Sequence, residues 1–337
     1  MNKINHSGFA GKHGSSDNAM ILAVIARVRK IPLLYKLQST VRQYFHAFKF
    51  RLLVGRPVVD SATFLERAIS ERIPLAAGKI GSTEAAALKT RLIRRKEQDK
   101  YGEPRTAYSR WITHTLFINS GVFPQSEEVF DRFGDDYLQA VGECDVLAAW
   151  HVAGEAEILR AFCPHTIFVR LMSLEPYFCD PPWSRVLKGK RVLIISPFSK
   201  SVERQYANHE ELWRDPKVLP EFELLTIRAP FSAGLVPPDS QDWFEALARL
   251  KEKMDGIDYD VALIGAGAFS LPLAVHARKE GKVGIHLGGA LQILFGIAGA
   301  RWDKLQDFKS FINESWCRPS AEETPENFSR NEEGCYW

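Results

Sequence analysis

The stretch Pro74-Leu75-Ala76-Ala77-Gly78-Lys79-Ile80-Gly81-Ser82-Thr83-Glu84, continued by Ala85-Ala86-Ala87-Leu88, decides how the rest of the chain is organised. The apolar run from Leu75 to Ala77 predicts a buried strand, and the glycines that follow permit a tight turn. From Ser82 onward the pattern predicts a helix, with Ser82 at or near its N-cap. The stretch is therefore expected to form a strand, a glycine turn and a helix start.

This turn is suited to binding an anion. Free backbone N–H groups and the positive end of the helix would face a ligand such as a phosphate. Lys79 adds a full positive charge, and Glu84 places a carboxylate in the first helical turn. A purely structural alternative remains, in which Ser82 caps the helix, Glu84 interacts with its dipole, and Gly78 and Gly81 only turn the chain.

The rest of the chain alternates strands and helices. Continuous apolar runs are typical of strands covered on both faces of a parallel sheet. The expected strands are 75–77, 144–150, 166–171, 191–196, 223–228, 260–266 and 283–287, and the expected helices are 60–72, 82–96, 107–119, 125–142, 154–162, 201–213, 240–254, 271–280 and 290–297. This order predicts an α/β fold, a Rossmann-like parallel sheet flanked by helices, with ligands at the carboxyl ends of the strands.

The first 56 of the 337 residues differ from the remainder in charge. They contain ten Lys or Arg residues and one Asp, whereas the remainder contains 34 basic and 40 acidic residues. Residues 1–19 are expected to be poorly ordered and 20–31 to form a short helix, and 33–53 have the pattern of a basic amphipathic helix. That helix predicts either a membrane-surface anchor or a helix packed on the core or on a second subunit. We expect a leader, 1–56, and an α/β domain, 57–337.

Composition indicates an ordinary globular protein of a reducing compartment. Hydrophobic residues make up 45% of the chain and charged residues 25%. Five scattered cysteines show no metal-binding spacing, which predicts free thiols, and no segment reads as a signal peptide. We expect a cytoplasmic protein, peripheral on the inner face of the cell membrane if the basic helix is an anchor. No nucleic-acid-binding motif is found, so no nucleic-acid partner is expected.

Two loops after predicted strands offer polar side chains. Glu175 follows the strand 166–171 and is held extended by Pro176, which makes it a candidate general base for a sugar hydroxyl or a surface residue with no task. Ser199, after the strand 191–196, is a candidate helix cap or phosphate ligand.

Two further loops combine glycine with a strand end. Gly265 and Gly267 resemble a dinucleotide-binding turn, but Ser270 stands at the third glycine position and no acid ends the following strand. A close backbone approach to a ligand remains expected there. His286, followed by Gly288 and Gly289, forms a second potential anion site, although a histidine at a strand end can equally be structural.

The segment Gly78-Lys79-Ile80-Gly81-Ser82-Thr83-Glu84 resembles the Arg-Ile-Gly-Asp-Gly-Glu signature of the GT-D type of bacterial glycosyltransferase. The segments 174–177, 260–265, 286–290, 294–296, 301–303 and 334–337 resemble a branch of that family associated with surface polysaccharide synthesis. The similarity covers roughly residues 60–337. Ser82 replaces the first carboxylate of the signature, and only Glu84 matches.

The resemblance implies transfer of a sugar from a nucleoside diphosphate sugar, with a UDP-sugar favoured, to a glycan or lipid-linked acceptor. Glu84 would bind a metal or orient the nucleotide-sugar, and Lys79, His286 and the turn amides would stabilise the diphosphate. Mn²⁺ or Mg²⁺ is the implied cofactor, although a hard cation prefers several oxygen ligands and one carboxylate is missing. Two alternatives stay open: a non-catalytic nucleotide-binding protein, and a Rossmann-type oxidoreductase.

Overall fold

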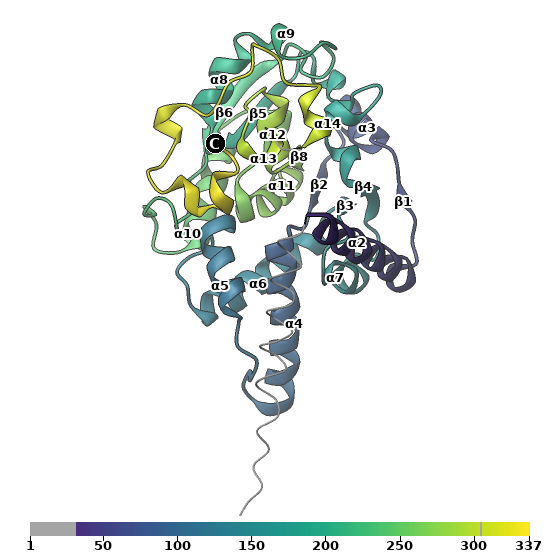
Figure 1. Cartoon of the computed structure of the whole chain (residues 1–337), viewed down its shortest axis with the longest axis vertical. Helices are drawn as coiled ribbons and strands as arrows, with labels where there is room; N and C mark the ends of the chain where they lie inside the picture. The colour runs from purple at the N-terminus through teal and green to yellow at the C-terminus, as the bar shows by residue number, and fades with distance from the viewer. Residues whose placement is uncertain (1–31, 304) are drawn as a thin grey trace, which may run out of the picture. The chain divides into compact units, whose positions relative to one another are not determined.

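A computed structural model describes residues 32–303 and 305–337, with side chains from Thr40 onward. The expectations for residues 1–19 and 20–31 lie outside this described part. The chain divides into two compact units between Lys49 and Phe50, and the second unit holds the whole sheet. The expected α/β fold is confirmed, because one sheet of eight parallel strands is flanked by helices (Figure 1).

The strands lie in the order β1-β4-β3-β2-β8-β7-β5-β6. Their bounds are β1 Val58–Val59, β2 Leu75–Lys79, β3 Val146–Ala149, β4 Ile167–Arg170, β5 Arg191–Ser196, β6 Glu223–Arg228, β7 Val261–Ile264 and β8 Val283–His286. β2 pairs with β3 on one side and with β8 on the other. The chain therefore leaves β2 toward one half of the sheet, while β8 joins it from the other half, and such a point is where open α/β sheets bind ligands.

Alternation along the strands gives the sheet two apolar faces. In β5, Leu193 and Ile195 pack into one core cluster, whereas Val192 and Ile194 pack into the other. The first cluster is covered by α4, α6, α10 and α11, and the second by α3, α8, α12 and the segments near the C-terminus. Burial on both faces explains why these strands are continuous apolar runs rather than alternating ones.

The described helices largely follow the expected order. The longer ones are α2 Pro32–Val54, α3 Thr63–Glu71, α4 Ser82–Tyr101, α6 Glu127–Gly142, α7 Glu155–Phe162, α8 Ser199–Tyr206, α10 Trp243–Asp255 and α11 Ser270–Lys279. Shorter ones are α5 Arg110–Thr115, α9 His209–Leu212, α12 Gly289–Leu294, α13 Ala300–Asp303 and α14 Gln306–Lys309. Among the described helices, none is both long and apolar enough to cross a membrane.

Three local features differ from the expectations. The helix expected over 107–119 is α5 continued by a π-helical turn, Leu116–Ser120. The helix expected over 201–213 is divided into α8 and α9, and the short edge strand β1 was not expected. Ser82, by contrast, lies as expected near the N-cap, because it is the first residue of α4 and follows the N-cap Gly81.

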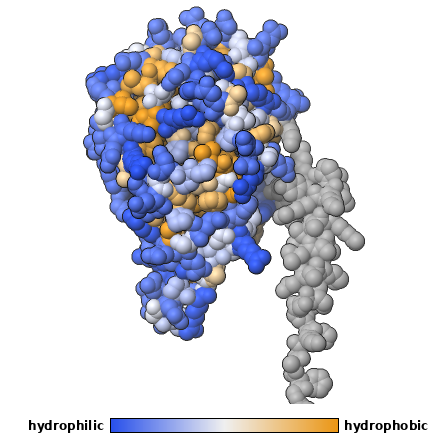
Figure 2. All heavy atoms as spheres, turned by 90° about the vertical axis from the view of Figure 1, so that its left-hand side faces the viewer, coloured by the Kyte–Doolittle hydropathy of each residue, from blue (hydrophilic) through white to orange (hydrophobic). Residues whose placement is uncertain are grey.

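The C-terminal segment packs against the body of the protein through its last residues. The Trp337 indole donates a hydrogen bond to the Glu323 carbonyl at 2.8 Å, and its ring packs edge-on against Phe198. Figure 1 shows this segment in yellow, returning toward α8 and α13. On the side of the molecule drawn in Figure 2, hydrophobic residues gather in patches within a mostly hydrophilic surface. The five cysteines are all free thiols, as expected.

Candidate functional site

A cavity of about 210 Å³ lies at the carboxyl ends of the strands. Its walls come from the segments that follow β2, β3, β5, β6, β7 and β8, together with the π-helical turn and the C-terminal segment. This is where a parallel sheet is expected to bind its ligand.

Most of the residues singled out in the sequence meet in this cavity. Nine line it, namely Lys79, Gly81, Ser82, Glu84, Gly265, Gly267, His286, Gly288 and Gly289. Gly78, Glu175 and Ser199 do not line it. Gly78 precedes Lys79 in β2 and does not reach the cavity. A Cβ on Gly78 would lie 2.6 Å from Leu271 Cδ1 and 2.9 Å from His286 Cβ, so glycine here permits close packing.

The β2–α4 turn holds Glu84 against its own backbone. A Cβ on Gly81 would lie only 2.1 Å from Glu84 Oε2, so the carboxylate folds back over the glycine. Burial raises the pKa of Glu84. Two hydrogen bonds, one with the Ser120 side chain and one with the backbone amide of Glu84 itself, oppose that rise. Ser120 ends the π-helical turn, a kind of irregularity found often at functional sites. Glu84 is thus a buried carboxyl group in the wall of the cavity.

Lys79, the last residue of β2, brings a positive charge to the cavity. Its Nζ lies 3.9 Å from Glu175 Oε1 and 5.3 Å from the centre of the Trp150 ring. Burial lowers the pKa of Lys79, Glu175 opposes that shift, and Arg301 adds to it. Arg301 therefore lies near enough to Lys79 for their charges to interact, and each of the two cations also has an acidic partner.

Glu175 lies behind Lys79 rather than in the cavity wall. Burial raises its pKa, and Lys79 and the Tyr177 hydroxyl, which donates to Glu175 Oε2 at 3.0 Å, oppose the rise. In this position the carboxylate orients Lys79. The loop folds into short 3-10 turns that leave the Glu175 side chain only 12% exposed, so it is not the exposed surface residue of the alternative expectation, and its role as a base stays a prediction.

Ser199 does not line the cavity, and the helix end at which it lies already binds a carboxylate of the chain. Ser199 is the first residue of α8, and the free amides at that helix end are occupied by Glu323. Glu323 accepts from the Lys200 amide at 2.8 Å, from the Ser201 amide at 3.1 Å and from the Ser201 hydroxyl. The anion that this helix end attracts is therefore already part of the chain.

His286 ends β8 and is neutral. Burial, and to a lesser extent the Lys79 charge, lower the pKa of His286 from 6.5 to about 3, and a hydrogen bond with the Lys79 backbone opposes this shift. Its neutral imidazole has a single N–H, which the hydrogen bond with the Lys79 backbone uses, and it adds no charge to the cavity at neutral pH. Gly288 has φ +61°, a conformation that favours glycine. A Cβ at this position would lie 3.4 Å from His286 Nε2 and 3.6 Å from Lys79 Cε, so the absence of a side chain leaves space beside these two residues.

Several cavity residues were not singled out as site residues from the sequence. Arg301, in α13, forms an ion pair with Glu332, and its Nη1 contacts the Tyr336 hydroxyl at 3.3 Å. The Gln292 amide donates to the Tyr336 carbonyl at 2.7 Å and the Asn331 amide to the Ile118 carbonyl at 3.2 Å. Among the described residues neither amide's oxygen has a hydrogen-bond donor. Both oxygens are buried acceptors whose hydrogen-bonding capacity is unused.

Trp150 reaches the cavity from the end of β3. The loop that carries it is fixed by Glu155, whose carboxylate accepts from the Trp150 amide at 2.9 Å and from the His151 amide at 2.6 Å. Glu155 is fully buried, and burial raises its pKa to about 7. Trp150 itself is 38% exposed, which leaves an aromatic face available for stacking at the cavity.

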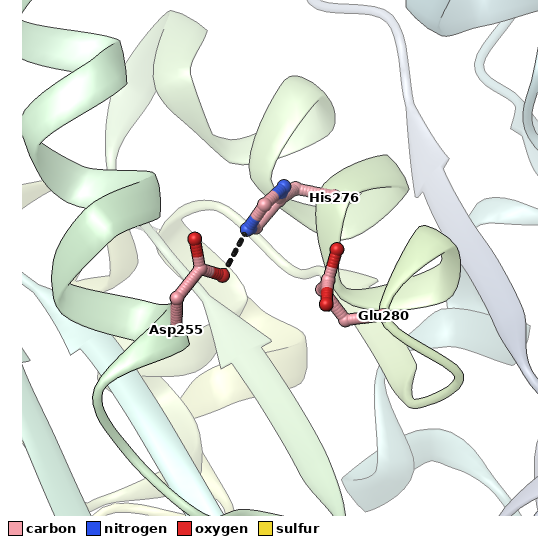
Figure 3. A group of neighbouring side chains, drawn as sticks. All are labelled: Asp255, His276 and Glu280. Carbon is pink, nitrogen blue, oxygen red and sulfur yellow. Dashed lines mark hydrogen bonds and ion pairs between the residues drawn. The ribbon is translucent and has the colours of Figure 1, made fainter.

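One group of potential metal ligands lies elsewhere. Asp255, His276 and Glu280 place their ligand atoms within 4.8 Å of one another, and His276 Nε2 is 2.7 Å from Asp255 Oδ1 (Figure 3). Asp255 ends α10 just before β7, and Glu280 follows α11 just before β8. The group is therefore at the edge where strands begin, opposite the cavity. Within the described chain, no group of three such ligands lies around Glu84.

No protein-family model, curated protein or solved structure matches the chain.

Proposed function

We propose that this protein is a nucleotide-sugar-dependent glycosyltransferase of the GT-D type. The observation that supports it most strongly is the convergence of the two glycine turns, after β2 and after β8, on one cavity. Both turns fall within the segments that resemble that family, and they are separated by about 200 residues of chain. A nucleoside diphosphate sugar needs cations and amides for its diphosphate and acceptors for its hydroxyl groups, and the cavity wall contains both.

The proposed roles follow the positions of the side chains. Lys79 and the amides of the two turns bind the diphosphate and stabilise its charge as the glycosidic bond breaks. Glu84, with its raised pKa, orients the nucleotide-sugar and takes the proton of the acceptor hydroxyl. Glu175, proposed from the sequence as the base, instead holds Lys79 in place.

The acceptor is proposed to be a glycan or a lipid-linked glycan at an anionic membrane surface. Helix α2 carries Arg42, Lys49 and Arg51, and Tyr44 and Phe48 on the same helix are 75% and 66% exposed. Such a helix suits binding to anionic headgroups. Flotation with vesicles containing anionic lipid tests this part, and equal recovery with neutral vesicles contradicts it.

The test of the main proposal combines ligand binding with turnover. Thermal unfolding is followed with UDP-, GDP-, CDP- and TDP-sugars and with NAD(H), each with and without Mn²⁺. A ligand at 100 times its Kd should add about 2.7 kcal/mol to the free energy of unfolding. Glu84→Gln should lose the response, whereas Glu128→Gln, which changes an exposed glutamate in the first turn of α6, should keep it.

The readouts separate the alternatives. Release of nucleoside diphosphate from the stabilising sugar, faster with an added acceptor and lost in Glu84→Gln, supports glycosyl transfer. Stabilisation without release identifies a non-catalytic nucleotide-binding protein. NAD(H) is tested because the Gly265–Gly267 turn in the cavity wall resembles a dinucleotide-binding turn. Stabilisation by NAD(H) alone contradicts the proposal.

A further inference from the structure

Two cations face the same cavity from distant parts of the chain. Lys79 comes from the end of β2 and Arg301 from α13. The Arg301 charge contributes to the lowered pKa of Lys79, as expected for like charges close together. Two neighbouring cations in a cavity favour an anionic ligand that carries more than one negative charge.

Arg301 is held in position by the C-terminal segment. Its guanidinium carbon lies 4.7 Å from the centre of the Tyr336 ring, and Nη1 contacts the Tyr336 hydroxyl at 3.3 Å. Nη2 pairs with Glu332, whose side chain is 43% exposed. A half-exposed carboxylate is a partner that a phosphate can replace, because a guanidinium binds either group through the same pair of N–H donors.

The cavity does not provide the donor set that a divalent cation prefers. Two acids line it, Glu84 and Glu332. The Glu84 carboxylate folds back over Gly81, and Glu332 is paired with Arg301. Ser82 stands where the resembled family has an acid. Hard cations take several oxygen ligands, and here both carboxylates already have other partners.

We infer that Lys79 and Arg301 together bind the diphosphate without a divalent cation, with Arg301 exchanging Glu332 for a phosphate oxygen. This inference rests on the proposed function, since it names how that site binds its anion. Arg301 supplies a planar pair of donors and Lys79 a compact charge. The second cation thus does what a metal would do in the resembled family.

The test measures affinity for UDP and for inorganic pyrophosphate by titration calorimetry in EDTA and again with Mn²⁺. The wild type should bind both in EDTA. Arg301→Gln should weaken binding by about tenfold or more, as expected for the loss of a charged hydrogen-bonding partner. Arg330→Gln is the matched control, because it removes one exposed arginine of the same segment that does not line the cavity.

Glu332→Gln gives the sharpest distinction. If Arg301 exchanges partners, removing the carboxylate should strengthen binding of pyrophosphate by a few-fold. If Glu332 instead holds a metal, the same substitution should weaken binding, and only with Mn²⁺ present. This variant decides the question even if Arg301→Gln proves too unstable to purify.

Three results overturn the inference: no binding in EDTA, unchanged affinity in Arg301→Gln, or weaker binding in Glu332→Gln. These outcomes differ from failure of the proposed function. Binding that needs Mn²⁺, accompanied by sugar transfer, removes the inference and leaves the glycosyltransferase. Binding of pyrophosphate in EDTA without transfer from any nucleotide-sugar leaves the anion site and removes the glycosyltransferase.

Discussion

At the scale of single residues, His286 couples the cavity to pH. Its pKa falls from 6.5 to about 3 on folding, mainly because the imidazole is buried. Between pH 6.5 and pH 3, the unfolded chain therefore binds a proton at His286, whereas the folded protein does not. The stability that depends on neutral His286 is fully present above pH 6.5 and is lost as the pH falls toward 3.

His286→Gln removes this dependence. Between pH 7.5 and pH 4 the wild type should lose about 3 kcal/mol of unfolding free energy through this residue, and the variant should not. Urea unfolding of both proteins at a series of pH values measures the difference. Parallel profiles would mean that the histidine titrates alike in the folded and unfolded states.

Single residues also show what the sequence can and cannot reveal about the site. Lys79, Glu84 and Gly288 could be predicted because each lies next to a strand end, and parallel strands bring their ends to one edge. Arg301 was marked only as part of the segment 301–303 that resembles the family, with no role assigned, and nothing local marks Asn331. Asn331 reaches Ile118, 213 positions away, and only the folded C-terminal segment brings the two together.

At the scale of elements, the strands were easier to predict than the segments that close the site. β5 and β6 have the bounds expected from the sequence. In β5 the residues Val192 to Ile195 are buried on both faces of the sheet and are therefore all apolar, whereas in the edge strand β6 only Ile227 is buried. β1 has two residues, both only partly buried, and so carries no such signal. The π-helical turn before Gly121 has the composition of an ordinary helix, and its form depends on packing that local sequence does not encode.

Two glycines on neighbouring elements should respond differently to alanine. A Cβ on Gly284, in β8, would lie 2.4 Å from the carbonyl oxygen and 2.6 Å from the Cα of Ala274 in α11. Both atoms are backbone, so helix and strand must separate. Gly284→Ala should cost more than about 2 kcal/mol of unfolding free energy.

Gly81→Ala is the functional counterpart. Gly81 has φ −67° and ψ 158°, which alanine adopts freely, and its new Cβ would meet only the flexible Glu84 carboxylate. The free energy of unfolding of Gly81→Ala should therefore stay within about 1 kcal/mol of the wild type. Because the new Cβ displaces the Glu84 carboxylate, nucleotide-sugar should no longer stabilise the variant. Urea unfolding and ligand-dependent melting measure the two effects, and an unchanged ligand response in Gly81→Ala would place Glu84 outside the binding site.

At the scale of the whole molecule, the C-terminal segment completes a site begun by β2. Its Asn331, Glu332 and Tyr336 line the cavity, although the sheet is finished at β8. Glu323 attaches this segment to the body by occupying the free amides of α8. The buried carboxylate thus caps a helix and positions one wall of the cavity with the same contacts.

Glu323→Ala tests whether the wall depends on this attachment. The substitution leaves the Lys200 and Ser201 amides without their acceptor, so the free energy of unfolding should fall by about 2–4 kcal/mol. Hydrogen exchange should rise in 318–337 more than in the strands, and binding of pyrophosphate should weaken because Arg301 loses its support. Glu322→Ala is the control, since that neighbouring carboxylate pairs only with exposed Lys200. Equal exchange in both variants would show that the aromatic contacts of Trp337 hold the wall without Glu323.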